Sequence, residues 1–191
     1  MITFSLNTRI SCSKYSSPSS PPGGRQSKYS GQAVRALPIR ILTVGRKRSQ
    51  GVQLLVDEYK DKLKLYCNFE DILIRSNPKN TSNVKAQIEG EDALVMQHIK
   101  SGDWVVLLDE HGLDIGSEQM ADMVGDAGNS GSSTLSFCIG GPYGHGRQVR
   151  ERANVTIKLS SMVLNHQIAL VVLLEQLYRA WTILKGQKYH H

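Results

Sequence analysis

The residues best suited to chemistry are gathered near the end of the chain. Glu175 and Arg179 lie four positions apart, so in a helix the carboxylate lies one turn from the guanidinium and can orient it. Tyr189 adds an aromatic ring near the end of the chain. His190 carries an imidazole, whose ordinary pKa suits proton transfer near neutral pH. These four are the candidate catalytic residues, although Glu175 and Arg179 also fit an ordinary surface ion pair.

The segment that carries Glu175 and Arg179 is otherwise apolar. From Gln167 to Leu184 the pattern is helical, and five large side chains recur on one face at four- and three-residue steps. A helix that is apolar nearly all round must be covered on nearly all sides. One side can pack on the chain's own sheet, and the other then needs a second subunit, so the pattern predicts a homodimer. The five residues of the first face are Leu170, Leu174, Leu177, Trp181 and Leu184.

A glycine turn, Ile139 to Gly144 (IGGPYG), is the second notable feature. It does not match GxGxxG, it follows the fourth expected strand instead of the first, and it lacks the Lys-Ser/Thr pair of a phosphate loop. A dinucleotide site and a nucleotide-hydrolase site are therefore disfavoured. The glycines either permit a tight turn with positive φ angles, or Gly141 lets a cofactor lie against the backbone.

The chain from residue 39 alternates strands and helices. Such alternation predicts an α/β fold, with a parallel sheet covered by helices on both faces. Ligands on these sheets bind beyond the carboxyl ends of the strands. Three such ends carry the notable residues: Leu108-Asp109, Gly140-Gly141 and Leu159-Ser160. The expected strands are Ile39–Gly45, Phe69–Arg75, Asp103–Leu108, Leu135–Ile139 and Val155–Leu159, and the expected helices are Gln50–Cys67, Val84–Lys100, Ser117 to about Gly125, and Gln167–Leu184.

The end of the chain also carries a family resemblance. The sequence LEQLYRAW, a short spacer and a Tyr-His pair resemble the end of the RlmH-type ribosomal RNA methyltransferases of the SPOUT (knotted) class. The likeness continues upstream in order and spacing, over about residues 39 to 191. Each piece alone is weak, but the ordered set is specific. The upstream pieces are Leu107–Gly112 (LLDEHG), Ser117-Glu118, Phe137–Gly144 (FCIGGPYG), Leu159–Met162 (LSSM) and His166-Gln167.

The resemblance implies S-adenosylmethionine as cofactor, held in a C-terminal trefoil knot. It implies methylation at N3 of a pseudouridine in large-subunit ribosomal RNA, within the assembled ribosome. In that chemistry His190 would accept the imide proton, Tyr189 would stack on the base, and Arg179 would bind a phosphate or the developing imide anion. The adenine would be read mainly by backbone groups. The implied cofactor contacts are Leu108, Gly141, Leu159, Ser160, Ser161, Met162, Val163 and Leu164.

Several positions depart from the family pattern. Leu170 stands where arginine is usual, and His191 stands where a terminal Lys or Arg usually follows. Asn165 replaces a usual proline, and asparagine is well suited to cap a helix. Threonine is common at the position of Val163, and proline at that of Lys188. Two hypotheses therefore remain: an active ribosomal RNA methyltransferase of an organelle, and a ribosome-binding or assembly protein that keeps the fold without efficient catalysis.

Residues 1 to 36 differ in composition from the rest of the chain. They are rich in serine and proline, and they contain five cations and no acid, so they supply +5 of the net charge of +6. The overall charge is therefore no argument for RNA binding. This composition is typical of a transit peptide, and the helix-breaking run SSPSSPPGG favours the chloroplast over the mitochondrion. The alternative is an ordinary disordered tail. We expect a disordered transit peptide over 1–36 and one domain over 37–191.

The remaining residue types suggest no further site. Cys12, Cys67 and Cys138 are widely spaced, and they form neither a disulfide framework nor a metal-ligand pattern. The six histidines show no HxH or HxxxH spacing. We therefore expect no bound metal. We also expect no membrane-spanning segment.

Overall fold

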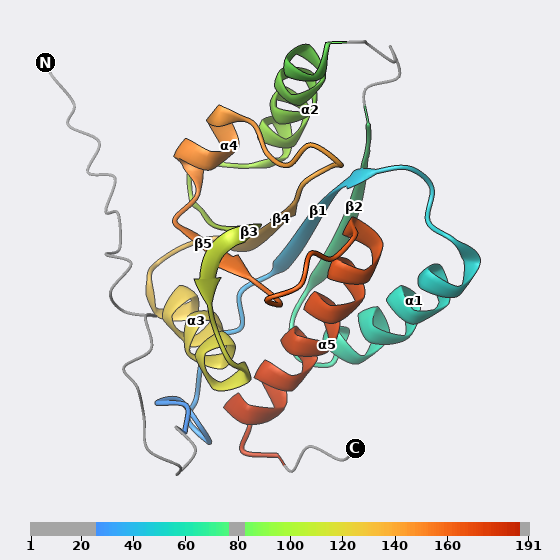
Figure 1. Cartoon of the computed structure of the whole chain (residues 1–191). Coiled ribbons are helices and arrows are strands. Elements are labelled where there is room, and N and C mark those ends of the chain that lie inside the picture. Colours follow the sequence, from blue (N-terminus) through green and yellow to red (C-terminus); the bar gives the residue numbers. More distant parts are fainter. Residues whose placement is uncertain (1–25, 77–82, 188–191) are drawn as a thin grey trace, which may run out of the picture.

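Five parallel strands form one sheet with a layer of helices on each face (Figure 1). This computed structural model describes residues 26–76 and 83–187. The strand order is β2-β1-β4-β3-β5. The strands are β1 Ile39–Gly45, β2 Phe69–Arg75, β3 Asp103–Asp114, β4 Thr134–Ile139 and β5 Val155–Lys158. The helices are α1 Gln50–Lys64, α2 Val84–His98, α3 Ser117–Asn129, α4 Arg147–Arg152 and α5 His166–Leu184.

The predicted α/β fold with a covered parallel sheet is confirmed. Helices α1, α3 and α5 pack together on one face, and α2 and α4 pack together on the other. β4 is buried at all six positions, because strands lie on both its sides and helices on both its faces. Its side chains serve two separate cores: Phe137 packs with α1, α3 and α5, whereas Cys138 packs with α2 and α4. The C-terminal trefoil knot stays a prediction.

Strand β3 is twice as long as the sequence predicts. It was expected to end at Leu108, but it continues to Asp114 after a register shift in which both Leu108 and Leu113 pair with Ile157 of β5. A Cβ on Gly112 would lie 2.4 Å from the Ile157 carbonyl carbon, so only glycine allows this close approach. The shift pushes the residues between Leu108 and Leu113 out at the carboxyl edge of the sheet.

Other boundaries differ from expectation for local reasons. α1 ends at Lys64 instead of Cys67, because the Tyr66 and Cys67 N–H groups turn back to the Leu63 carbonyl. α2 ends at His98, where the next residue is already extended. α3 continues past Gly125 to Asn129. The six-residue helix α4 has no counterpart among the predicted elements.

The packed structure begins earlier than the predicted domain boundary. Residues 26–36, which we name the N-terminal strap, were expected to be disordered, but they lie against α3 and the end of α5. Ser27 is buried and donates a hydrogen bond from Oγ to Asp122 Oδ1 at 2.7 Å. Residues 26–36 are therefore ordered in this structure, and the division into a transit peptide and a domain stays a prediction. The rest of the predicted transit peptide, residues 1–25, lies outside the described residues.

Helix α5 begins where the sequence suggests. The Asn165 side chain caps it by accepting hydrogen bonds from the Gln167 and Ile168 N–H groups, both at 3.0 Å. The helix is long and apolar enough to cross a bilayer, but half of it is buried inside the domain, between α1, α3 and the sheet. This is the pattern of a core helix. Ile168, near its start, is 44% exposed.

Candidate functional site

A cavity of about 810 Å³ opens at the carboxyl edge of the sheet, where the sequence placed the site. This volume is typical of a site for a small organic ligand, on the order of 300–1,000 Å³. Three segments form most of the wall: Leu108 to His111 within β3, the glycine turn and following residues from Ile139 to His145, and the loop from Lys158 to Asn165 that leads into α5. Arg150 of α4 and His166 and Ala169 of α5 complete it.

Seven of the eight predicted cofactor contacts line this cavity. Ser161 is exposed and is not part of the wall. Met162 and Val163 are 73% and 80% exposed, so the loop presents apolar side chains at the cavity mouth. The Ser160 side chain accepts a hydrogen bond from the Met162 N–H at 3.0 Å, which fixes the turn of this loop. The contacts in the wall are Leu108, Gly141, Leu159, Ser160, Met162, Val163 and Leu164.

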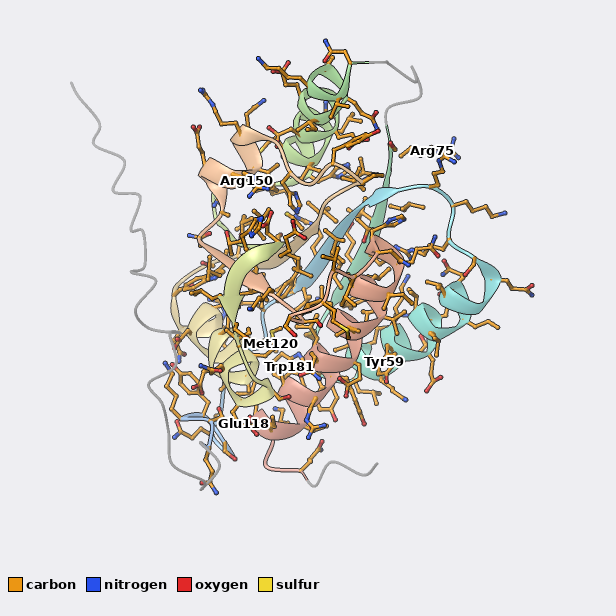
Figure 2. All side chains as sticks on the ribbon, viewed as in Figure 1. Tyr59, Arg75, Glu118, Met120, Arg150 and Trp181 are labelled. Carbon is orange, nitrogen blue, oxygen red and sulfur yellow. The ribbon has the colours of Figure 1, made fainter. Side chains whose placement is uncertain are left out.

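A polar network that the sequence did not suggest joins two walls of the cavity. Arg150 of α4 donates from Nη2 to Asp109 Oδ2 at 2.6 Å and from Nε to the His145 carbonyl at 3.1 Å. His145 in turn donates from Nε2 to the Leu108 carbonyl at 3.2 Å, because a carbonyl can only accept. Arg150 lies beside the end of the sheet in Figure 2. The network thus ties the end of β3 to the glycine turn.

The environment sets the charge of these groups. Burial, with a smaller contribution from the nearby Arg150 cation, lowers the pKa of His145 to about 4, so the imidazole is neutral near pH 7. Burial alone would raise the pKa of Asp109, but hydrogen bonds from the His111 N–H and from Arg150 outweigh it, so the pKa is lowered. Asp109 and Arg150 therefore form a fixed ion pair in the wall, and His145 is a neutral hydrogen-bond donor beside it.

Two buried carboxylates of α2 contact the glycine turn and the start of α4. Asp92 accepts hydrogen bonds from the Gln148 and Val149 N–H groups at 2.8 and 3.0 Å, so it caps the start of α4. Glu91 is 2% exposed, and its Oε1 accepts hydrogen bonds from Ser76 at 2.6 Å and from Gln87 at 3.1 Å. These contacts fix the position of the turn relative to the sheet.

The role predicted for Gly141, contact with a cofactor, stays a prediction. Gly141 lines the cavity, but a Cβ there would lie 2.8 Å from Glu91 Oε2 and 3.2 Å from Val44 Cγ1. The space left by the missing Cβ therefore faces the side chains of Glu91 and Val44. The glycine is needed because Glu91 packs directly against the turn.

His166, the first residue of α5, adds a polar atom to the cavity wall. Its Nε2 is buried and has no hydrogen-bond partner among the described residues. The ring packs against β1, since a Cβ on Gly45 would lie 2.8 Å from it. A buried polar atom without a partner is costly. His166 can therefore serve a bound ligand.

Two of the predicted catalytic residues, Glu175 and Arg179, are not part of the cavity wall of their own chain. Glu175 and Arg179 follow His166 by nine and thirteen positions on α5, which is about 14 and 20 Å along the helix axis. The Glu175 charge instead acts on Tyr59 of α1, whose pKa is raised mainly by burial and further by Glu175. Tyr189 and His190 lie outside the described residues.

Comparisons with known proteins identify the family of this chain. The model of a family described as "Predicted SPOUT methyltransferase" matches residues 37–190. The chain belongs to the SPOUT methyltransferase family. It is 71% identical over 175 residues to "Putative RNA methyltransferase" of Arabidopsis thaliana, covering 92% of this chain and 91% of that protein. It is 37% identical over 156 residues to "Ribosomal RNA large subunit methyltransferase H" of Clostridium botulinum, covering 80% and 98% respectively.

A SPOUT methyltransferase uses S-adenosylmethionine, so the predicted cofactor, enzyme class and family are confirmed, with RNA as the substrate class. Among solved structures, the SpoU methyltransferase AviRb of Streptomyces viridochromogenes matches with a TM-score of 0.40 at 13% identity, covering 81% of this chain and 62% of that one. That likeness is too low to carry an argument. The cavity itself fits the cofactor, because its apolar loop suits the adenine faces and His166 offers a buried polar atom.

Proposed function

We propose that this SPOUT methyltransferase modifies N3 of a pseudouridine in the large-subunit ribosomal RNA of an organelle, and that it works as a homodimer. The observation that carries the proposal is the cavity. Seven predicted cofactor contacts meet there, at the carboxyl ends of β3, β4 and β5. The relative from Clostridium botulinum is named as a methyltransferase of large-subunit ribosomal RNA, which supports this choice of substrate.

The residues of the cavity wall act mainly by positioning. S-adenosylmethionine supplies a methyl group on a sulfonium, which leaves as a neutral thioether, so no acid is needed on that side. The apolar loop from Leu159 to Leu164 covers the cofactor, and the Asp109–Arg150–His145 network holds the facing wall in place. Alignment of the donor with the acceptor is then the main contribution of the protein to the rate.

The methyl acceptor also needs groups for its proton and its developing charge, and the described wall of the cavity does not include Glu175 or Arg179. Removing the imide proton requires a base, for which we propose His190, with Tyr189 stacked on the base. Arg179, oriented by Glu175, would balance the developing negative charge. Because Glu175 and Arg179 lie one-half to two-thirds of the way along α5 from the cavity, we propose that a two-fold partner supplies them.

Exposed apolar side chains near the mouth of the cavity are an argument for a dimer. Met162, Val163 and Ile168 are all exposed and apolar, and they lie together at the cavity mouth and the start of α5. A second copy would cover this apolar rim while bringing the polar end of its own α5 over the cavity. The homodimer thus explains both the exposed apolar loop and the distant catalytic candidates.

The organelle is proposed from composition. Residues 1–25 keep the serine-rich, acid-free character of a transit peptide, and their helix-breaking run favours the chloroplast, with the mitochondrion as the alternative. A substrate in an organellar ribosome fits an enzyme whose relatives act on bacterial ribosomal RNA.

One observation favours a second candidate, a ribosome-binding protein without efficient turnover. Leu170, where the family usually has arginine, is fully buried in the core and gives no cation to the cavity. Mass spectrometry of large-subunit RNA from chloroplasts, mitochondria and cytosol, with and without this protein, separates the two. We expect loss of one methylated pseudouridine in the chloroplast RNA alone. Unchanged RNA in all three compartments would support the second candidate.

A further inference from the structure

The N-terminal strap lies outside the part of the chain that the family model matches, which begins at residue 37. Its composition is that of a targeting segment, yet it forms a tight turn. The Ser30 and Gln32 N–H groups donate to the Ser27 and Tyr29 carbonyls at 3.2 and 3.0 Å. The strap therefore has the composition of a targeting segment that is cleaved off, but it is folded.

The strap is bonded to two carboxylates of α3. Asp122, which is 3% exposed, accepts hydrogen bonds from Ser27 Oγ at 2.7 Å and from the Lys28 N–H at 2.9 Å. Asp126 accepts a hydrogen bond from Tyr29 Oη at 2.7 Å and pairs with Lys28 Nζ at 2.6 Å. Hydrogen bonds to ionised carboxylates are among the stronger ones in proteins.

The interior of α3 is shaped to receive the strap. A Cβ on Gly125 would lie 2.2 Å from Tyr29 Cδ2, and a Cβ on Gly128 would lie 2.5 Å from the Arg35 carbonyl oxygen. Glycine weakens a helix interior, so two glycines within one turn need a reason. The reason here is that both glycines lie where the strap comes closest to α3.

The strap also caps the end of α5. The Gly31 N–H donates to the Leu184 carbonyl at 3.0 Å, and this carbonyl belongs to the last turn of the helix, where intrahelical partners run out. Gly31 has a φ of +71°, a conformation that favours glycine. The strap thus ties α3 to the last turn of α5.

We propose that the strap is a permanent part of the mature protein, and that any targeting peptidase cuts before Ser27. A protease needs an accessible and locally unfolded backbone, whereas Ser27 is buried and hydrogen-bonded in the folded chain. The strap would then hold the last turn of α5 in the working enzyme.

The first test is the N-terminus of the protein isolated from the tissue that makes it. The protein is captured with an antibody against the folded domain, and its terminal peptide is identified by mass spectrometry. We expect a chain that retains Ser27, whether or not residues before it have been removed. A mature chain that lacks Ser27 would overturn the proposal. This result does not depend on cofactor or RNA.

The second test compares two serines of the same turn in the full chain. Ser27→Ala removes the bond to Asp122, whereas Ser30→Ala changes an exposed serine three positions later and serves as the control. Ser27→Ala should lower Tm by about 2–6 °C and should speed amide exchange in the peptide that covers residues 179–187. Tyr29→Phe, which keeps the ring against Gly125, should give a smaller change in the same direction. Equal Tm and exchange for Ser27→Ala and Ser30→Ala would refute a role of the strap in holding α5.

Discussion

The Oε2 atom of Glu91 lies 2.8 Å from the position that a Cβ on Gly141 would occupy. Glu91 comes from α2, on the far side of the turn from the cofactor cavity, and its other oxygen is held by Ser76 and Gln87. The glycine turn therefore lies between the cavity on one side and a buried carboxylate on the other. The shape of the cavity depends on this contact.

A pair of variants tests the contact between Glu91 and Gly141. Gly141→Ala should weaken S-adenosylmethionine binding about tenfold or more, because the new methyl group pushes the turn away from Glu91 and into the cavity. Adding Glu91→Ala removes the obstacle and should restore most of the affinity, as measured by calorimetry. The control is Gly140→Ala, whose Cβ would meet the Gly144 backbone at 2.9 Å and which Glu91→Ala cannot relieve. Equal affinity for Gly141→Ala with and without Glu91→Ala would show that the contact is absent.

His145 gives the stability of the domain a particular dependence on pH. The folded protein keeps this imidazole neutral down to about pH 4, whereas in the unfolded chain it takes up a proton below about 6.5. The unfolded state thus binds more protons in this window, and stability falls as the pH falls from 6.5 to 4. Wild type should lose on the order of 3 kcal/mol relative to His145→Gln in denaturant titrations across this range.

The glutamine variant is a suited reference, because its amide can still donate to the Leu108 carbonyl but does not titrate. Asp109 does not disturb the comparison, because its pKa is lowered in the fold and its contribution is lost only at more acidic pH. Parallel stability curves for the two proteins would contradict the buried, neutral state of His145.

The proposed two-chain site can be tested by mixing inactive variants. Arg179→Ala should remove the cation that balances the developing negative charge on the acceptor base. Gly141→Val should abolish cofactor binding. Each homodimer should therefore be inactive. After the two proteins are unfolded and refolded together, half of the dimers would be mixed, and each would carry one intact site. Methylation should then return to about a quarter of the wild-type rate. No recovery, with mixed dimers present by mass spectrometry, would place both residues in the site of one chain.

The C-terminal tail is predicted to act in the chemistry, and not in the fold. A chain ending at Lys188 should keep its Tm and its S-adenosylmethionine affinity, because a short polar terminus contributes little to a core. It should lose methylation of ribosomes, since Tyr189 and His190 are gone. His190→Ala should slow the reaction most near and above neutral pH, where the neutral imidazole is the base. Equal rates for the full and truncated chains would remove the tail from the mechanism.

The fold was largely predictable, because apolar periodicity marks long elements well. The exceptions have physical reasons. Helix α4 has the sequence RQVRER, with a single apolar residue, so it shows no period. The strap resembles a disordered segment, and its order depends on the side chains of Ser27 and Tyr29 meeting α3, which no local pattern reveals.

The site was predictable in place but not in detail. Three strand ends indicated where the cavity lies, since parallel strands align their carboxyl ends. The direction of a missing Cβ is not visible in a sequence, so the close approach of Glu91 to Gly141 could not be predicted. Arg150 gave no signal, because it belongs to the unpredicted α4. Asp109 and His145 adjoin recognised motifs, but only the fold brings them within reach of Arg150.

The most direct test of the account is methyl transfer by the purified protein. Ribosomes are isolated from chloroplasts that lack the protein and from chloroplasts that contain it, and both are incubated with methyl-labelled S-adenosylmethionine. We expect about one labelled methyl group per large subunit in the first ribosomes and almost none in the second, where the position is already modified, with the label on N3 of a pseudouridine. Absence of label from both, while the protein binds the cofactor and the ribosome, would contradict the proposed enzyme and leave a ribosome-binding protein.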